Sequence, residues 1–264
     1  MRYLGPSRPR VFGHRGAAAL APENTLPSFA LAAELGAGYL ELDVHGTQDG
    51  TIVVLHDETV DRTTDATGAV REMSWRMVEN LDAGYRFRIG DALFPYRGQG
   101  VRIPTLEAVL QAFPAHCFNI EIKQADPPLV DEVVGILRRR GAAERTLLAA
   151  AEDRVMEDVR RAVRGDIVTG SSIGDVGEFF GHLDAGTIDQ YAPPGVALQI
   201  PTRVGERELV NAASIAAAHE KGVEIHVWTI NDAVEIDQLL ALGVDGIMSD
   251  APGLVSAAVA RRRR

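Results

Sequence analysis

Two acidic residues that share one face of a predicted strand are the clearest sign of chemistry in this sequence. Glu41 and Asp43 lie in the apolar segment 39–44, which predicts a β-strand. Because side chains alternate between the faces of a strand, both carboxylates point to the same side, roughly 6.6 Å apart. Two carboxylates on a buried face lose hydration and repel each other. A hard divalent cation such as Mg²⁺ or Ca²⁺, which prefers oxygen ligands, would remove both costs.

A second predicted strand, 118–123, carries an acid and a base in the same relation. Glu121 and Lys123 are two positions apart and therefore share a face. On their own they are equally well explained as a surface ion pair. Together with Glu41 and Asp43, however, they provide a third carboxylate. Three carboxylates can hold a divalent cation, with water or substrate oxygens completing its coordination.

Two histidines, His14 and His56, each follow a short apolar run that predicts a strand. A lone histidine at a strand end is more often a satisfied polar residue than a catalyst. Two of them at the same end of barrel strands, each beside a predicted metal ligand, favour an acid and base pair, because imidazole titrates near neutral pH. With Arg15, Lys123 and the acids, they indicate phosphoryl transfer. In such a site cations bind phosphate oxygens while the histidines exchange protons with the attacking and leaving oxygens.

The elements that must position these residues alternate along the chain. Strands are predicted at 10–13, 39–44, 51–55, 118–123, 146–150, 167–170, 196–200, 224–229 and 246–248. Helices are predicted from Asn24 or Thr25 to Glu34 and at 106–113, 126–140, 153–164, 206–220 and 232–241. Repeated βα units predict a parallel sheet closed into an α/β barrel. A barrel has eight places for these nine segments, so one lies outside it; the patterns at 167–170 and 196–200 are the weakest.

In such a barrel the carboxyl ends of the strands meet at one mouth, which would bring the distant polar residues together. Trp228, Asn231 and Asp250 follow later strands and are expected at the same end. Trp228 is explained either as an apolar wall for a substrate or as part of the core. Residues 57–103 hold no long periodic segment, and a connection of this length is usually functional. We expect a single domain over 1–264 with an inserted subdomain at 57–103.

Composition excludes several classes of protein. The net charge of −10 opposes nucleic-acid binding and gives no attraction to anionic membranes, and no apolar run is long enough to span a bilayer. No apolar segment follows the basic N-terminal residues, which favours a cytoplasmic protein. The single cysteine, Cys117, excludes an internal disulfide and is expected to be a small buried residue. The arginines at 261–264 are expected to form a solvated, frayed end. The sequence does not indicate an oligomeric state.

Ten short motifs occur in the order typical of one enzyme family. They are His14-Arg15-Gly16, Pro22-Glu23-Asn24-Thr25, Glu41-Leu42-Asp43-Val44, Asp49-Gly50, Leu55-His56-Asp57, Arg62-Thr63-Thr64, Leu81-Asp82-Ala83-Gly84, Pro104-Thr105-Leu106-Glu107, Glu121-Ile122-Lys123 and Val227-Trp228-Thr229-Ile230-Asn231. Over about residues 11 to 250 the sequence resembles the glycerophosphodiester phosphodiesterase family. The resemblance implies a TIM (β/α)8 barrel with an insertion after the third strand.

The resemblance also implies roles for the site residues. His14 and His56 would be the acid and base, and Arg15 and Lys123 would contact the phosphate. The implied ligands of Mg²⁺ or Ca²⁺ are Glu41, Asp43 and Glu121. The implied reaction is hydrolysis of a glycerophosphodiester, such as glycerophosphocholine, to sn-glycerol 3-phosphate and an alcohol. The nucleophile is either water or the glycerol 2-hydroxyl, which would give a cyclic phosphate first.

Two other functions stay open at this point. A related diesterase of the lysophospholipase D type would act on lysophospholipids and release choline or ethanolamine. The aromatic side chains of the insertion would then either line an acyl channel or pack the insertion itself: Trp75, Tyr85, Phe87, Phe94 and Tyr96. The second alternative is a barrel that only binds a phosphorylated ligand, which would be expected to lack a histidine or a carboxylate.

Overall fold

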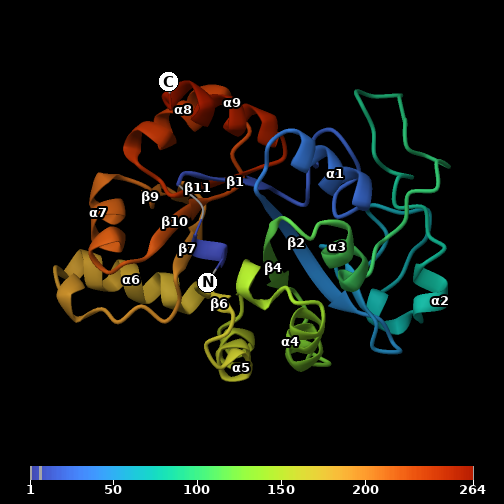
Figure 1. The fold of residues 1–264 in the computed structure, drawn as a ribbon, viewed down its shortest axis with the longest axis horizontal. Helices are drawn as coiled ribbons and strands as arrows, with labels where there is room; N and C mark the ends of the chain where they lie inside the picture. Colours follow the sequence, from blue (N-terminus) through green and yellow to red (C-terminus); the bar gives the residue numbers. More distant parts are fainter. Residues whose placement is uncertain (1, 6–7, 264) are drawn as a thin grey trace.

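A computed structural model of the protein describes residues 2–5 and 8–263. Within these residues eight parallel strands run in the order β6-β5-β4-β2-β1-β11-β10-β7. Their bounds are β1 Arg10–Gly13, β2 Tyr39–Gly46, β4 Cys117–Ile122, β5 Thr146–Ala149, β6 Val168–Thr169, β7 Ala197–Ile200, β10 Glu224–Val227 and β11 Gly246–Ser249. A parallel bridge between Gly170 and Ala197 joins the two ends of this order. The predicted barrel is confirmed (Figure 1).

The strand that lies outside the barrel is β3 (Ile52–Val54), which pairs antiparallel with β2. The segments with the weakest patterns, 167–170 and 196–200, both supply barrel strands instead. The reason is the turn between β2 and β3, where Gly50 has a positive φ of 81°. A turn this short can join antiparallel neighbours, whereas parallel strands need a long crossover. The expectation that His56 follows a barrel strand is therefore wrong.

Helices follow the barrel strands and form the outer layer (Figure 1). Their bounds are α1 Leu26–Glu34, α2 Trp75–Val78, α3 Leu106–Ala112, α4 Val130–Arg139, α5 Asp153–Val163, α6 Ile173–Ala185, α7 Ala212–Glu220, α8 Ala233–Leu242 and α9 Pro252–Arg262. Short 3₁₀ turns lie at η1 Arg2–Leu4, η2 Val70–Glu72, η3 Ala143–Arg145 and η4 Ile188–Gln190. The helix that completes the β2 unit is α3, which comes only after β3 and residues 57–103.

Several helix boundaries differ from the sequence pattern. The helix predicted at 206–220 begins at Ala212, because Asn211 caps it and a small hairpin of β8 (Arg203–Val204) and β9 (Arg207–Glu208) precedes it. The helix predicted from Asp126 begins only at Val130. The pattern gave no helix at α6, which contains three glycines of low helical propensity but begins at a capping box of Ser172 and Asp175. At α1 the cap is Thr25, whose side chain accepts from the Ser28 amide.

Two hydrophobic layers follow from the alternation of strand side chains. An outer layer lies between the strands and the helices, while an inner layer with Phe12 and Tyr39 fills the barrel. The inner layer also contains a buried ion pair. Arg10 donates to both oxygens of Glu224 at 2.7 and 2.6 Å, and Nε2 of His226 lies 2.9 Å from the same carboxylate. Paired in this way, the buried charges keep the hydrogen bonds that burial would otherwise remove.

Residues 57–103 extend from one side of the barrel with little regular structure (Figure 1). They have a hydrophobic cluster of their own, which joins Val53 of β3 to Val60, Val70, Val78 and Val101. Asp82 organises the irregular backbone, because its carboxylate accepts from the amides of Gly84 at 2.9 Å and Gly98 at 2.7 Å.

The aromatic side chains of this segment mostly pack against their neighbours. Phe87 and Tyr96 meet edge to face, with ring centroids 5.3 Å apart. The Arg97 guanidinium lies 3.7 Å from the ring centroid of Phe94 and 4.3 Å from that of Tyr85. Most of these rings are therefore engaged in packing.

The C-terminal arginines are more ordered than the sequence indicated. Arg261 and Arg262 belong to α9 and donate to Asp237, while Arg264 lies outside the described residues. Cys117 is buried and unbonded to another cysteine, as expected. Among the described residues, none of the helices has the length and apolar character that crossing a bilayer requires.

Candidate active site

Three carboxylates from two neighbouring barrel strands meet at the carboxyl end of the barrel. In the described part of the chain, Glu41, Asp43 and Glu121 offer oxygen atoms that all lie within 4.8 Å of one another. The parallel register places Asp43 directly beside Glu121. Glu41 and Asp43 are buried, with 4% and 1% of their surface exposed. An all-oxygen donor set of this kind fits a hard divalent cation such as Mg²⁺ or Ca²⁺.

Two cationic side chains lie against these carboxylates. Arg15 places Nε 3.3 Å from Asp43 Oδ2. Lys123 places Nζ 3.2 Å from Asp43 Oδ1 and 2.8 Å from Glu121 Oε2. Burial alone would lower the pKa of Lys123, but the charges of Asp43 and Glu121 outweigh it and raise that pKa. Burial would likewise lower the pKa of Arg15, but the charges of Asp43 and Glu23 raise it, so both side chains stay charged beside the carboxylate cluster.

Glu41 is the least compensated of the carboxylates. It accepts a hydrogen bond of 2.8 Å from the backbone amide of Arg15. Its burial and the adjacent charge of Asp43 raise the pKa of Glu41 to about 7. A divalent cation would favour the ionised form of Glu41 and relieve this repulsion.

The first loop of the barrel is bent sharply to bring its side chains to the site. Arg15 and Asn24 both have positive φ angles, of 49° and 57°, which are uncommon for residues other than glycine. Gly16 has a φ of 88°, and a Cβ added there would lie 2.3 Å from the Ser28 hydroxyl. The bend lets Asn24 donate to Asp43 at 3.0 Å. The backbone geometry of this loop thus explains why glycine stands at position 16 and asparagine at position 24 in the first two motifs.

His14 is held by a carboxylate from the last strand end. Its Nδ1 lies 2.7 Å from Oδ1 of Asp250, and Asn231 donates to the other oxygen of Asp250 at 2.7 Å. An ionised carboxylate only accepts, so Nδ1 carries a proton and Nε2 is the atom left for chemistry. Burial alone would lower the pKa of His14, but the hydrogen bond to Asp250 and the charge of Glu41 raise it.

His56 reaches the site through the β2–β3 hairpin rather than through a barrel strand. The amide of Leu55 donates to the carbonyl of Asp43 at 3.0 Å, which fixes His56 just beyond a predicted metal ligand. Nδ1 of His56 lies 2.7 Å from Oδ1 of Asp57, so this imidazole has the same kind of support as His14. The buried His45, to which the sequence gave no role, places Nε2 3.1 Å from the carbonyl of His56.

Trp228 follows β10 directly, and 43% of its surface is exposed. The alternative that this side chain belongs to the core is therefore wrong.

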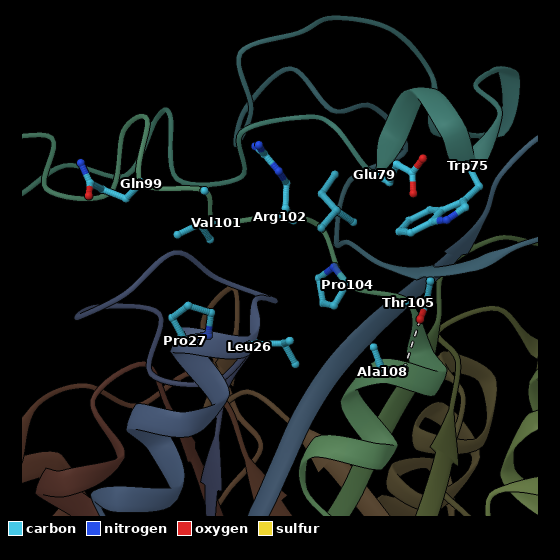
Figure 2. Close-up of a pocket in the computed structure, with 12 residues that line it drawn as sticks. Leu26, Pro27, Trp75, Glu79, Gln99, Val101, Arg102, Pro104, Thr105 and Ala108 are labelled. Atoms are coloured by element: carbon cyan, nitrogen blue, oxygen red, sulfur yellow. Dashed lines mark hydrogen bonds between the residues drawn. The ribbon is translucent and has the colours of Figure 1, made fainter.

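A cavity of about 490 Å³ lies beside the barrel mouth (Figure 2). It is bounded by Leu26 and Pro27 at the first turn of α1, by Thr105 and Ala108 at the start of α3, and by Trp75 at the start of α2. None of the three carboxylates and neither histidine lines it. The cavity is thus separate from the carboxylate cluster.

Comparison with known proteins gives a consistent result. The model of the glycerophosphoryl diester phosphodiesterase family matches residues 14–254. A glycerophosphodiester phosphodiesterase from Caldanaerobacter subterraneus subsp. tengcongensis is 31% identical over 252 residues, covering 92% of this chain and 94% of that protein.

Solved structures agree. A glycerophosphodiester phosphodiesterase from Agrobacterium tumefaciens superimposes with a TM-score of 0.76 at 28% identity, covering 94% of this chain and 99% of that chain. An Oleispira antarctica phosphodiesterase in complex with the product sn-glycerol-3-phosphate superimposes with a TM-score of 0.77 at 25% identity, covering 96% and 97%. The chain belongs to the glycerophosphoryl diester phosphodiesterase family.

Proposed function

We propose that this protein hydrolyses glycerophosphodiesters such as glycerophosphocholine to sn-glycerol 3-phosphate and an alcohol, with the help of Mg²⁺ or Ca²⁺. The observation that carries the proposal is the cluster of Glu41, Asp43 and Glu121, whose oxygens lie within 4.8 Å of one another in a member of this family. The similar Oleispira antarctica phosphodiesterase, described with sn-glycerol-3-phosphate as its product, supports the choice of substrate.

In this mechanism each histidine has a carboxylate on Nδ1 and acts through Nε2. One of His14 and His56 removes the proton of the nucleophile, either water or the glycerol 2-hydroxyl, and the other protonates the departing alkoxide. Arg15 and Lys123 hold the phosphate through their charges. When bound, the divalent cation supplies Lewis-acid stabilisation of the charge that develops on the phosphate oxygens. With the 2-hydroxyl as nucleophile, the histidines exchange roles to hydrolyse the cyclic phosphate.

The test is release of sn-glycerol 3-phosphate from glycerophosphocholine before and after treatment with a chelator. We expect activity to be lost with the chelator and to return with Mg²⁺ or Ca²⁺. A matched variant, Glu121→Gln, removes one charged ligand and should need a higher cation concentration for half-maximal activity. Full activity of the chelated wild type would refute metal dependence. Release of choline from lysophosphatidylcholine but not from glycerophosphocholine would show an activity of the lysophospholipase D type.

A further inference from the structure

One arginine outside the mechanism described above bridges two loops of the barrel mouth. Arg62 donates to both oxygens of Asp57, from Nε at 2.6 Å and from Nη2 at 3.1 Å. It also donates to both oxygens of Glu23, from Nη1 at 2.6 Å and from Nη2 at 2.7 Å. A single guanidinium thus makes paired hydrogen bonds to two carboxylates, which the planar fork of arginine permits.

Each of these carboxylates continues to a side chain of the site. Oδ1 of Asp57 lies 2.7 Å from Nδ1 of His56. Oε1 of Glu23 accepts from Nη1 of Arg15 at 3.0 Å. Glu23 belongs to the loop after β1 and Asp57 to the segment after β3, so the two carboxylates come from separate parts of the chain. Arg62 therefore contacts a direct partner of His56 and a direct partner of Arg15.

We propose that Arg62 is a positioning residue that fixes His56 through Asp57 and Arg15 through Glu23, and so sets the proton-transfer group and the phosphate-binding group relative to each other. The inference rests on the proposed function only for the roles of His56 and Arg15. The positions themselves follow from the contacts of Arg62.

The simplest competing explanation is an ordinary surface ion pair, which contributes little to stability. Arg62 is indeed half exposed, with 47% of its side chain accessible. Its partners are less so, at 19% for Glu23 and 29% for Asp57, and each has a second polar contact. Without Arg62 the two carboxylates would face each other as like charges. They would then be expected to move apart and take His56 and Arg15 with them.

Charge supports the same view. The hydrogen bond from Arg62 is the main influence that lowers the pKa of Asp57 to about 2. Burial alone would raise the pKa of Glu23, but hydrogen bonds from Arg62 and the charge of Arg15 lower it. Both carboxylates consequently stay ionised and able to orient their partners near neutral pH.

The expected kinetic effect has two separable parts. Arg62→Ala should lower kcat, because His56 is no longer held in its orientation. It should also raise KM, because Arg15 is no longer held in place to bind the phosphate. Loss of an orienting partner typically reduces activity roughly 10- to 100-fold, which is the expected loss in kcat/KM. Asp57→Asn should act mainly on kcat and Glu23→Gln mainly on KM.

The test places Arg62→Ala in the wild type, in Asp57→Asn and in Glu23→Gln, with glycerophosphocholine as substrate. In the Asp57→Asn background, Arg62→Ala should still raise KM but no longer lower kcat. In the Glu23→Gln background, it should still lower kcat but no longer raise KM. The control is Arg138→Ala, which removes a similarly exposed paired contact from α4 to Asp166 in the loop after α5 and should leave both constants unchanged. Equal effects of Arg62→Ala in all three backgrounds would overturn the proposal.

Two further measurements separate positioning from folding and from the proposed function. Arg62→Lys keeps the charge but cannot form paired bonds to two carboxylates, so it should melt like the wild type and still lose part of kcat/KM. Wild-type rates in this variant would overturn the proposal. The imidazole NMR signal of His56, assigned with His56→Gln, should change in Arg62→Ala even if no diester is hydrolysed. An unchanged His56 signal in Arg62→Ala would refute the positioning role. If the signal changes but the wild type hydrolyses no diester, only the proposed function is refuted.

Discussion

The contact between His14 and Asp250 allows a quantitative prediction. Asp250→Asn keeps the size of the side chain but removes its charge, so the 2.7 Å hydrogen bond from Nδ1 of His14 loses its charged acceptor. Asn231 would compete for the new amide, because it now contacts both the side chain and the backbone of Asp250. The imidazole of His14 would then no longer be held with Nε2 free for proton transfer.

The magnitude follows from the kind of bond that is lost. Hydrogen bonds to charged groups contribute about 1.5–3 kcal/mol, which corresponds to roughly 10- to 150-fold in rate if the orientation is needed in the transition state. The substitution also removes the main influence that raises the pKa of His14, and the burial that remains lowers it. The limb of the pH–rate profile that reports His14 should therefore move to lower pH.

The assay is release of sn-glycerol 3-phosphate as a function of pH for the wild type and Asp250→Asn. The matched control is His219→Gln. It breaks another histidine–aspartate contact, in which Nε2 of His219 lies 2.8 Å from Oδ2 of Asp245, away from the carboxylate cluster. We expect this control to keep wild-type constants. An Asp250→Asn enzyme with kcat/KM within twofold of the wild type and an unshifted profile would refute the assigned role of Asp250.

Three other predictions follow from the same geometry. His14→Ala and His56→Ala should each reduce kcat roughly 10²- to 10⁴-fold while leaving the circular dichroism spectrum intact, and wild-type rates would remove the acid and base assignment. Burial alone would raise the pKa of Glu224, but hydrogen bonds from Arg10 and His226 lower it from 4.5 to about 2. The stability that this shift supplies is complete above pH 4.5 and is lost as pH falls towards 2, so acid titration should destabilise the wild type by up to about 3 kcal/mol more than Glu224→Gln. Glycerophosphocholine should be turned over faster than a long-chain lysophospholipid, because most aromatic rings of the insertion pack against neighbours; the opposite preference in a direct comparison would contradict this.

The barrel could be predicted from the sequence because its evidence is periodic and repeated. The assignment of individual strands was harder, since β3 is as apolar as the barrel strands. Residues 57–103 cover Val53 of β3, while Ile52 and Val54 pack in the main core, so the pattern of β3 matches that of a strand buried on both faces. The short link through Gly50 is the signal that would have separated it, because only antiparallel neighbours can be joined so closely.

The site could be predicted in its parts more than in its connections. Residues at strand ends stand out when their charge is unexplained by packing, as with Glu41 and Asp43. Glu23 and Arg62 belong to two of the ten motifs, but their charge is no indication of a role, because isolated charges in loops are common on any surface. Their contact depends on two loops that meet only in the folded chain, at distances of 2.6 and 2.7 Å. Sequence spacing holds no information about such a meeting.

The carboxylate cluster illustrates how a functional site lowers stability, and this can be measured. The pKa of Glu41 is raised by burial and by Asp43 from 4.5 to about 7. Above pH 7 the unfolded chain ionises this group freely while the folded chain does so at a cost, so its ionisation destabilises the cation-free fold by about 3 kcal/mol. Glu41→Gln should remove this cost and raise the unfolding free energy at pH 8 in chelator. The wild type should recover stability on adding Mg²⁺ or Ca²⁺, because a ligand that binds only the folded state stabilises it, and the variant should recover less. A variant that is no more stable than the wild type in chelator, and equally stabilised by the cation, would contradict the view that Glu41 is a buried carboxylate whose charge a bound cation compensates.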